Sequence, residues 1–250
     1  SLSRAILNGL KQNPNIGDSP TLDVYDRFQW TPVMEKWTDG LDIGRRPEVG
    51  GSYQHLFEHS VKGYLDNINI HEIDFEAEST NAPDTEVLIV DIMKSFKITD
   101  NVGASFFPKM MIGGHIIHQD YLHFGHGWIQ LITWRLRDHL KLSWIAGEAA
   151  MVDFEVTKKI SSEMCYSLKE IPPYSPDEVF EAFDWNRSLF PQRFEAILSA
   201  AEIFLLAMCG YGEAAGREKF EEAKSKGWLS HPAFVEMTDF CKTWNIIDLS

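Results

Sequence analysis

"TEVLIVDIM", residues 85–93, is a nearly unbroken run of valine, leucine and isoleucine that ends beside Asp91. An apolar run of this length is what a strand needs when both of its faces are covered, as in parallel sheets packed between helices. The stretch therefore predicts a strand buried on both faces, with Asp91 at its carboxyl end.

Strands and helices alternate outward from this run in both directions. Helices are predicted at residues 1–12, 52–65, 98–110 and 126–140, and a long irregular excursion at 27–51. The other predicted strands are TLDVYD (21–26), NINIHEIDF (67–75), GGHIIHQDY (113–121), KLSWIA (141–146) and AMVDFEVTKKI (150–160). Such alternation predicts an α/β fold, an open sheet with right-handed crossovers.

The pattern changes after Ile160, where only helices are predicted. The first of the longer helices has Ser175 before Pro176 and acids in its opening turn, which is a strong N-terminal signal. We therefore predict two parts, an α/β domain at residues 1–160 and a C-terminal helical region at residues 161–250.

Composition and charge narrow the class of protein. Thirty-seven acidic and 23 basic residues give the 250-residue chain a formal net charge of -14, which repels nucleic-acid backbones and anionic membranes. The most apolar helical stretch, 196–212, is too short to cross a bilayer and carries Glu202. Three widely spaced cysteines offer neither a disulfide framework nor a metal knuckle. We therefore expect a soluble cytoplasmic protein with a small-molecule partner and neither a nucleic-acid nor a membrane partner.

Acidic residues follow four of the predicted strands. Asp26, Asp91 and Asp120 end three of them, and Asp74 lies near the end of a fourth. In open α/β sheets, ligands bind beyond the carboxyl ends of the strands. A helix cap or a turn explains each aspartate on its own equally well, but four acids at one edge of a sheet favour a polar ligand.

The positions of these acids indicate separate roles. Asp26, at the end of an early strand, suits a bidentate hydrogen bond to ribose hydroxyls. Phe75 beside Asp74 could stack on a base or pack in the core. Asp91 and Asp120 should lie on neighbouring strand ends, close enough to share a Mg²⁺ ion or to flank a reacting hydroxyl.

Four histidines lie around Asp120 in the sequence. His115 and His118 would point to opposite faces of a strand and cannot ligate one zinc ion together; we expect His115 to be buried near the strand start. His118, His123 and His126 lie near or beyond the strand end, where a neutral imidazole can take a proton from a substrate hydroxyl. Capping and packing explain each of them as well. Asp120 is the best-placed catalytic candidate, and His118 is the histidine that we pair with it.

Familiar catalytic and phosphate-binding motifs are absent from the sequence. Its glycine pairs, in VGGS and MIGG, do not follow a strand and open a helix, and there is no P-loop, GxSxG or HExxH. The sequence therefore offers no support for a kinase or a hydrolase.

The order of motifs between residues 86 and 128 resembles a known family. A strand ending in Asp91 is followed by a helix, "FFPK", a Gly-Gly turn, a strand ending in Gln-Asp-Tyr and another helix. This order resembles class I S-adenosylmethionine-dependent methyltransferases, in particular the macrocin-type sugar O-methyltransferase branch. The resemblance covers residues 1–158 and implies a Rossmann-like open sheet that is mostly parallel, with an antiparallel last strand.

The resemblance implies a role for each strand-end acid. It implies that Asp26 holds the ribose of the cofactor and that Asp74 and Phe75 border the adenine. Asp91 and Asp120 would bind a Mg²⁺ ion or orient the acceptor hydroxyl, and Asp91 would also contact the cofactor. The implied reaction is attack by a hydroxyl oxygen of a sugar, or of another small polar metabolite, on the sulfonium methyl group of S-adenosylmethionine.

Two departures from the family pattern leave alternatives open. Ile92, Met93 and Lys94 stand where this branch has further acids, and Gln119 replaces the first of two aspartates. Metal dependence therefore stays open, and Lys94 is a candidate substitute for the cation. The family's first strand and glycine-rich turn are missing before Ser1, and we expect them upstream of it.

Three hypotheses follow for the function. The first is an active O-methyltransferase, in which the helices after residue 161 shape the acceptor site or a contact between two copies in a homo-oligomer. The second is a methyltransferase-like domain that has lost catalysis and serves as a binding or scaffold module of a larger protein. The third, a nicotinamide-dependent oxidoreductase, requires GxGxxG after the first strand. The sequence leaves the acceptor and the oligomeric state open.

Overall fold

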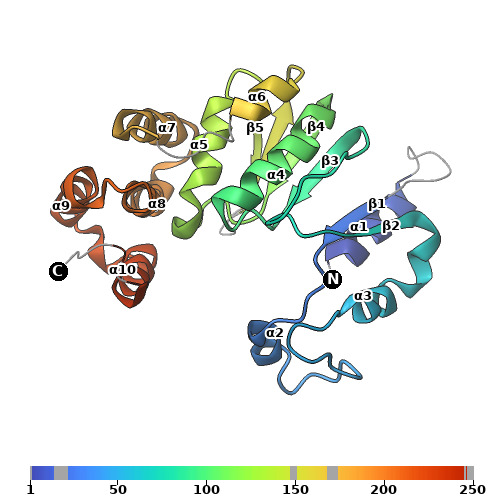
Figure 1. Cartoon of the computed structure of the whole chain (residues 1–250). Helices are drawn as coiled ribbons and strands as arrows, with labels where there is room; N and C mark the ends of the chain where they lie inside the picture. Colours follow the sequence, from blue (N-terminus) through green and yellow to red (C-terminus); the bar gives the residue numbers. More distant parts are fainter. Residues whose placement is uncertain (1, 14–21, 147–150, 168–173, 245, 247–250) are drawn as a thin grey trace. The chain divides into compact units, whose positions relative to one another are not determined.

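A computed structural model describes residues 2–13, 22–146, 151–167, 174–244 and 246 (Figure 1). The chain divides into two units, Ser1–Glu78 and Ser79–Ser250, and the division falls in the polar loop before the apolar run at 85–93. Thr21 and Ala150, the first residues of two predicted strands, lie outside the described residues.

The first unit is built around two parallel strands. β1 (Leu22–Asp26) pairs with β2 (Ile68–Glu72), so both strands predicted in this part of the chain are confirmed. The helices of this unit are α1 (Leu2–Gln12), α2 (Pro32–Trp37), α3 (Gln54–Ser60) and the 3₁₀ helix η1 (Lys62–Asn67).

The excursion between β1 and α3 folds around aromatic side chains. Phe28 and Trp30 are buried, and their rings contact the ring of Tyr53 at centroid distances of 5.4 and 6.4 Å. A single antiparallel bridge between Gln29 and Ser52 ties the two ends of the excursion together. These aromatic side chains therefore form the core of the excursion.

The second unit contains a four-stranded mixed sheet. Its strands are β3 (Thr85–Val90), β4 (Met110–His118), β5 (Leu140–Ile145) and β6 (Val152–Val156), in the order β3-β4-β6-β5. β3 and β4 are parallel, whereas β6 runs antiparallel to both β4 and β5. The structure therefore confirms an α/β fold with a mixed sheet, and the last strand is the antiparallel one.

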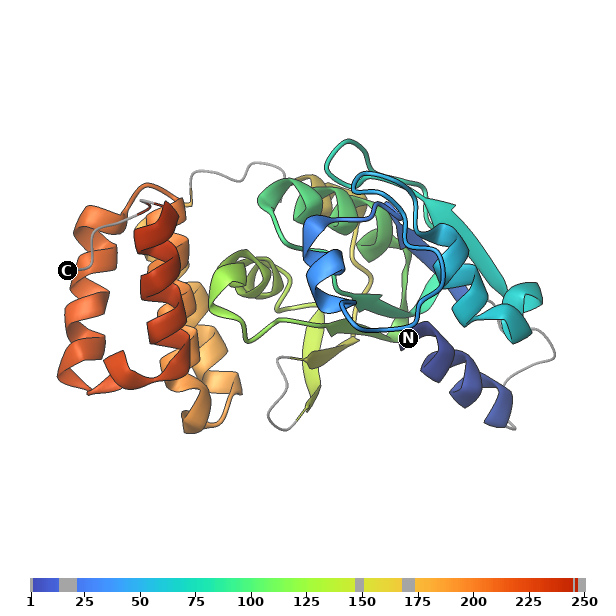
Figure 2. The ribbon, with the colours of Figure 1, turned by 90° about the horizontal axis from the view of Figure 1, so that it is seen from below.

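Helices cover one face of this sheet. α4 (Phe96–Phe106) connects β3 to β4, and α5 (Gly127–Arg135) connects β4 to β5 (Figure 1; Figure 2). Right-handed crossovers that advance in one direction place both helices on the same side. Leu88 and Val90 of β3 are buried, but Val87, which points to the opposite face, is 55% exposed. The prediction that β3 is buried on both faces is therefore wrong within this unit, because α4 and α5 lie on the other side.

The chain after residue 161 is helical in its described part, as predicted. Its elements are α6 (Ser162–Ser167), α7 (Pro176–Leu189), η5 (Gln192–Phe194), α8 (Glu195–Met208), η6 (Gly212–Gly216), α9 (Arg217–Ser225), η7 (Trp228–Ser230) and α10 (Pro232–Trp244). α7 begins at a capping box formed by Ser175 and Glu178. α8 is almost entirely buried and packs against α5, α7 and α10. The change at residue 161 is thus a change of secondary structure inside the second unit.

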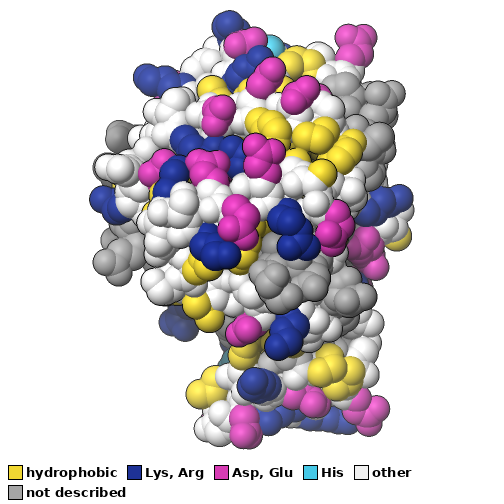
Figure 3. Space-filling model, turned by 90° about the vertical axis from the view of Figure 1, so that its left-hand side faces the viewer, with side chains coloured by type: hydrophobic (Ala, Val, Ile, Leu, Met, Phe, Trp, Pro, Cys, Tyr) yellow, Lys and Arg dark blue, Asp and Glu magenta, His cyan; other side chains and the backbone are white. Residues whose placement is uncertain are grey.

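The C-terminal helices carry charges of both signs on their outer surface. Figure 3 shows acidic and basic side chains interspersed over the face seen from the left of Figure 1. Ion pairs in α9 and at its two ends join Arg217 to Glu213 (3.2 Å), Lys224 to Glu221 (3.3 Å) and Lys226 to Glu222 (2.8 Å). Among the described residues, no helix combines the length and the apolar character that a membrane crossing requires.

Candidate functional site

β3 and β4 end side by side. Val90 pairs with His118, and the backbone N–H of Gln119 donates a hydrogen bond to the Val90 carbonyl oxygen at 2.9 Å. The chain leaves the two strands at Asp91 and Asp120, so these two acids lie on neighbouring strand ends. In open α/β sheets this edge is where ligands bind.

Lys94 joins the two acids. Its Nζ lies 3.3 Å from Asp91 Oδ1 and forms an ion pair with Asp120 Oδ2. We refer to Asp91, Lys94 and Asp120 as the strand-end cluster. All three side chains are partly exposed, so a ligand in solution can reach the cluster.

Helix α4 and Trp128 hold the segment that carries Lys94. Ser95 is the N-cap of α4, and its Oγ accepts a hydrogen bond from the backbone N–H of Ile98 at 3.2 Å. The Trp128 Nε1–H donates to the Met93 carbonyl oxygen at 2.9 Å, and the Met93 side chain is only 2% exposed. Lys94 therefore extends from a segment that is fixed on both sides.

Asp120 adopts a backbone conformation that is unusual for a residue with a side chain. Its φ is 61°, in the left-handed region, which aspartate and asparagine tolerate better than most residues. Its carbonyl oxygen accepts a hydrogen bond from the backbone N–H of His123 at 3.1 Å. Such strain is concentrated at functional sites, so the turn at Asp120 supports a role for this residue.

His126 lies beside the strand-end cluster. The carboxylate of Asp120 is close enough to influence its pKa, and its buried Nδ1 has no hydrogen-bond partner among the described residues. Burial lowers the pKa of His126 to about 4, and the charges of His123 and Lys94 add to this effect. The imidazole is therefore neutral near pH 7.

The structure separates the two histidines of β4, as the alternation of a strand predicted. His118 is 2% exposed and is surrounded by the rings of Phe107, Tyr121 and Phe154. A ligand at the strand ends cannot reach an imidazole in this position, so the structure gives no support to His118 as a catalytic residue. The prediction that His115 is buried is wrong, because its side chain is 38% exposed and its Nδ1 lies 2.9 Å from Asp153 Oδ2.

The burial of His118 should make the fold sensitive to acid. Burial lowers the pKa of His118 from 6.5 to about 4, so between these values the unfolded chain binds a proton that the folded chain does not. The free energy of unfolding should therefore fall by about 3 kcal/mol as the pH drops from 7 to 4. Urea denaturation of wild type and His118→Leu across this range should show a shallower pH dependence in the variant. Equal slopes for the two proteins would contradict this role for His118.

In the first unit, Asp26 shapes a turn at the end of β1. Its Oδ1 accepts a hydrogen bond from the backbone N–H of Phe28 at 2.6 Å, and its Oδ2 accepts one from the Tyr53 hydroxyl at 2.8 Å. Asp26 therefore stabilises a turn, which is one of the two explanations that the sequence left open for each aspartate. Each carboxylate oxygen has two acceptor sites, so Asp26 keeps the capacity to accept further hydrogen bonds.

Asp74 and Phe75 lie just after β2. Asp74 Oδ1 accepts a hydrogen bond from the backbone N–H of Glu76 at 2.9 Å, which is again a turn role. Phe75 is buried, with its ring 6.4 Å from that of Tyr25. Of the two roles that the sequence left open for Phe75, the structure favours packing in the core over stacking on a base.

The predicted site residues thus fall into two groups. Asp26, Asp74 and Phe75 belong to the first unit, and Asp91, His118 and Asp120 to the second. Lys94 and His126, which the sequence offered as a candidate cation substitute and a candidate proton acceptor, lie beside the two acids of the second unit.

The strand-end cluster does not fit a Mg²⁺ ion. Mg²⁺ requires close to octahedral coordination by oxygen atoms, but Asp91 and Asp120 share the ammonium group of Lys94. Within the described ranges, no group of three or more His, Cys, Asp or Glu side chains is arranged to hold a metal ion. We therefore assign no step to a metal.

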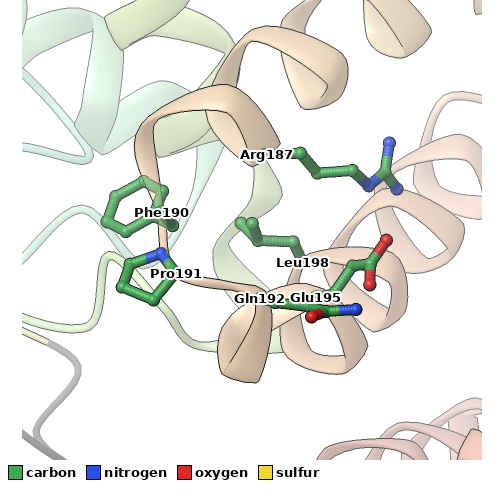
Figure 4. A pocket seen from close by; sticks show the side chains of 6 residues that line it. All are labelled: Arg187, Phe190, Pro191, Gln192, Glu195 and Leu198. Atoms are coloured by element: carbon green, nitrogen blue, oxygen red, sulfur yellow. The ribbon is translucent and has the colours of Figure 1, made fainter.

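A second polar feature lies between α7 and α8. A hollow of about 210 Å³ is lined by Arg187, Phe190, Pro191, Gln192, Glu195 and Leu198. Figure 4 shows that the guanidinium group of Arg187 points away from Phe190 and Pro191. The hollow is smaller than most ligand pockets, which measure about 300–1,000 Å³, so we place the candidate site at the strand-end cluster instead.

The Arg187 guanidinium is engaged in a buried ion pair. It pairs with Glu202 of α8, whose side chain is 0% exposed, and with Asp184 at 3.0 Å. Lys219 Nζ of α9 lies 3.9 Å from the other carboxylate oxygen of Glu202. Burial raises the pKa of the Glu202 carboxyl, and the Arg187 guanidinium offsets only part of that rise. The ion pair between Arg187 and Glu202 therefore links α7 to α8.

Comparison of the chain with protein-family models, with curated proteins and with solved structures found no match in any of the three.

Proposed function

We propose that this protein is an S-adenosylmethionine-dependent O-methyltransferase of the class I type, acting on a hydroxyl group of a sugar or of another small polar metabolite. The strand order is the observation that carries this proposal. In a doubly wound sheet of order 3-2-1-4-5, the second and third strands pair with each other, and so do the fourth and fifth. β1 pairs with β2, and β3 pairs with β4, each in parallel. In this comparison β1 and β2 correspond to the second and third strands of that order, and β3 and β4 to the fourth and fifth. β6 is the antiparallel last strand that the resemblance implies.

Asp120 is the residue to which we assign removal of the acceptor proton. It follows β4 at the edge of the sheet where ligands bind, and its partly exposed carboxylate is oriented by Lys94. The cofactor, when bound, supplies an activated methyl group. The methyl group would pass from the sulfonium sulfur of the cofactor to the acceptor oxygen, and the Asp120 carboxylate would take up the hydroxyl proton. In this scheme Asp26 accepts hydrogen bonds from the ribose, and Asp91 holds Lys94.

A methyltransferase-like binding module without catalysis is the second candidate. The observation that favours it is the engagement of the acids in local contacts. Both oxygens of Asp26 accept hydrogen bonds within the first unit, and Asp91 and Asp120 are paired with Lys94. A protein that has lost catalysis can keep such contacts because they stabilise turns.

Calorimetric titration of the full-length protein with S-adenosylhomocysteine tests the cofactor site. We expect binding in the micromolar range, and we expect Asp26→Ala to weaken it about 10–100-fold, because charge-assisted hydrogen bonds to the ribose are lost. Tyr53→Phe is the matched control. It removes the neighbouring hydroxyl that donates to Asp26 but keeps the carboxylate, so its affinity should stay close to that of wild type.

Thermal unfolding of each variant establishes that it is folded under the conditions of the titration. Absence of binding in the folded wild type would refute the active methyltransferase and leave a scaffold module without catalysis. Binding without methyl transfer to any hydroxyl acceptor would leave the binding module as the function.

A further inference from the structure

We propose that Lys94 takes the place of a divalent cation at the strand ends, so that an internal ammonium group holds Asp91 and Asp120 and the site works without a metal ion. The role of Lys94 in catalysis rests on the proposed function, whereas its ion pairs with Asp91 and Asp120 are independent of that function. Lys94 is a positioning residue in this arrangement, because it orients the carboxylate of Asp120.

The ammonium group occupies the position that a shared cation would need. Lys94 Nζ contacts one carboxylate oxygen of each acid, at 3.3 Å from Asp91 Oδ1 and in an ion pair with Asp120 Oδ2. A cation that bridged the same two oxygens would meet Lys94 at a distance of a few ångström. Two positive charges so close together repel each other strongly even near a protein surface. Either the ammonium or a metal ion can therefore neutralise the pair of carboxylates.

The two residues between Asp91 and Lys94 supply no side-chain ligand for a hard cation. Met93, between Asp91 and Lys94, is buried and its carbonyl oxygen accepts a hydrogen bond from Trp128. The other intervening residue, Ile92, has an apolar side chain. Mg²⁺ needs oxygen ligands in an octahedral arrangement, so two carboxylates and an ammonium group are a poor match for it.

Calorimetric titration of the full-length protein with Mn²⁺ tests whether Lys94 replaces a divalent cation. The experiment needs neither cofactor nor acceptor. Wild type should bind Mn²⁺ only weakly. In Lys94→Met the two acids lose their cation and keep their backbone positions, so Mn²⁺ should bind at least tenfold more tightly than in wild type. The gain should disappear in the double variant Lys94→Met/Asp120→Asn, because one of the two carboxylates is then absent.

Lys97→Met is the matched control. Lys97 lies in the first turn of α4 and is exposed, so this variant changes the net charge equally without touching the cluster, and its affinity for Mn²⁺ should equal that of wild type. The proposal is overturned if Lys94→Met binds Mn²⁺ no more tightly than wild type does, or if the double variant Lys94→Met/Asp120→Asn keeps the gain. Neither result depends on S-adenosylhomocysteine binding, so the two proposals can fail separately.

Discussion

Replacing Arg187 with alanine should lower the free energy of unfolding by about 3–5 kcal/mol, because the change leaves Glu202 buried without its main partner. Glu202 is fully buried, and the Arg187 guanidinium is its ion-pair and hydrogen-bond partner. Lys219, at 3.9 Å from the other oxygen, is too far away for a hydrogen bond. Urea denaturation followed by circular dichroism measures the change.

Two further variants separate the buried charge from the loss of packing. In Arg187→Met/Glu202→Leu both charges are replaced by apolar side chains, and most of the lost stability should return, because buried ion pairs are often replaceable in this way. Arg217→Ala breaks an exposed ion pair with Glu213 and should cost about 0–1 kcal/mol. If Arg187→Ala cost no more than Arg217→Ala, the pair would not stabilise the C-terminal helices.

Asp120→Asn should slow methyl transfer by about 10²–10⁴-fold, the range expected when a general base is removed. Asparagine tolerates the left-handed backbone that Asp120 adopts, so the substitution removes the charge and keeps the turn. The measurement is transfer of a labelled methyl group from S-adenosylmethionine to a panel of sugars and other small hydroxyl compounds. Affinity for S-adenosylhomocysteine should remain unchanged, because Asp120 serves the acceptor.

Asp84→Asn is the control for the charge change. Asp84 is exposed and directly precedes β3, at the opposite end of the same sheet. It should transfer methyl groups at the rate of wild type. An Asp120→Asn variant that is as active as Asp84→Asn would exclude Asp120 as the base and would direct attention to His126, the neutral imidazole beside it.

Much of the fold could be predicted because its signals are local. The apolar run at 85–93 contains β3, and the alternation around it marks each strand of both sheets within a few residues. Periodicity and turn residues depend only on neighbours in the sequence. The outer face of β3 was predicted wrongly because an apolar strand does not show how many of its faces receive a helix. That number depends on where the crossover helices lie.

The candidate site could be predicted in part. Asp91 and Asp120 follow the apolar strands β3 and β4. Because these strands are parallel neighbours, the two carboxylates lie at the same edge of the sheet. The sequence favoured His118 over His126 as the catalytic histidine, but it did not show that His118 is buried. The alternation of side chains along a strand places His115 and His118 on opposite faces of the sheet, but it does not show which face the helices cover.

The sequence by itself determined the alternation of strands and helices, the helical character after residue 161 and the acids at the strand ends, because period, capping and strand length are local properties. Only the tertiary structure decided that Lys94 pairs with Asp120, which lies 26 positions away, and that His118 is buried while His115 is partly exposed. Those outcomes depend on which strands pair and on which side of the sheet the helices pack, and both are set by contacts between residues far apart in the chain.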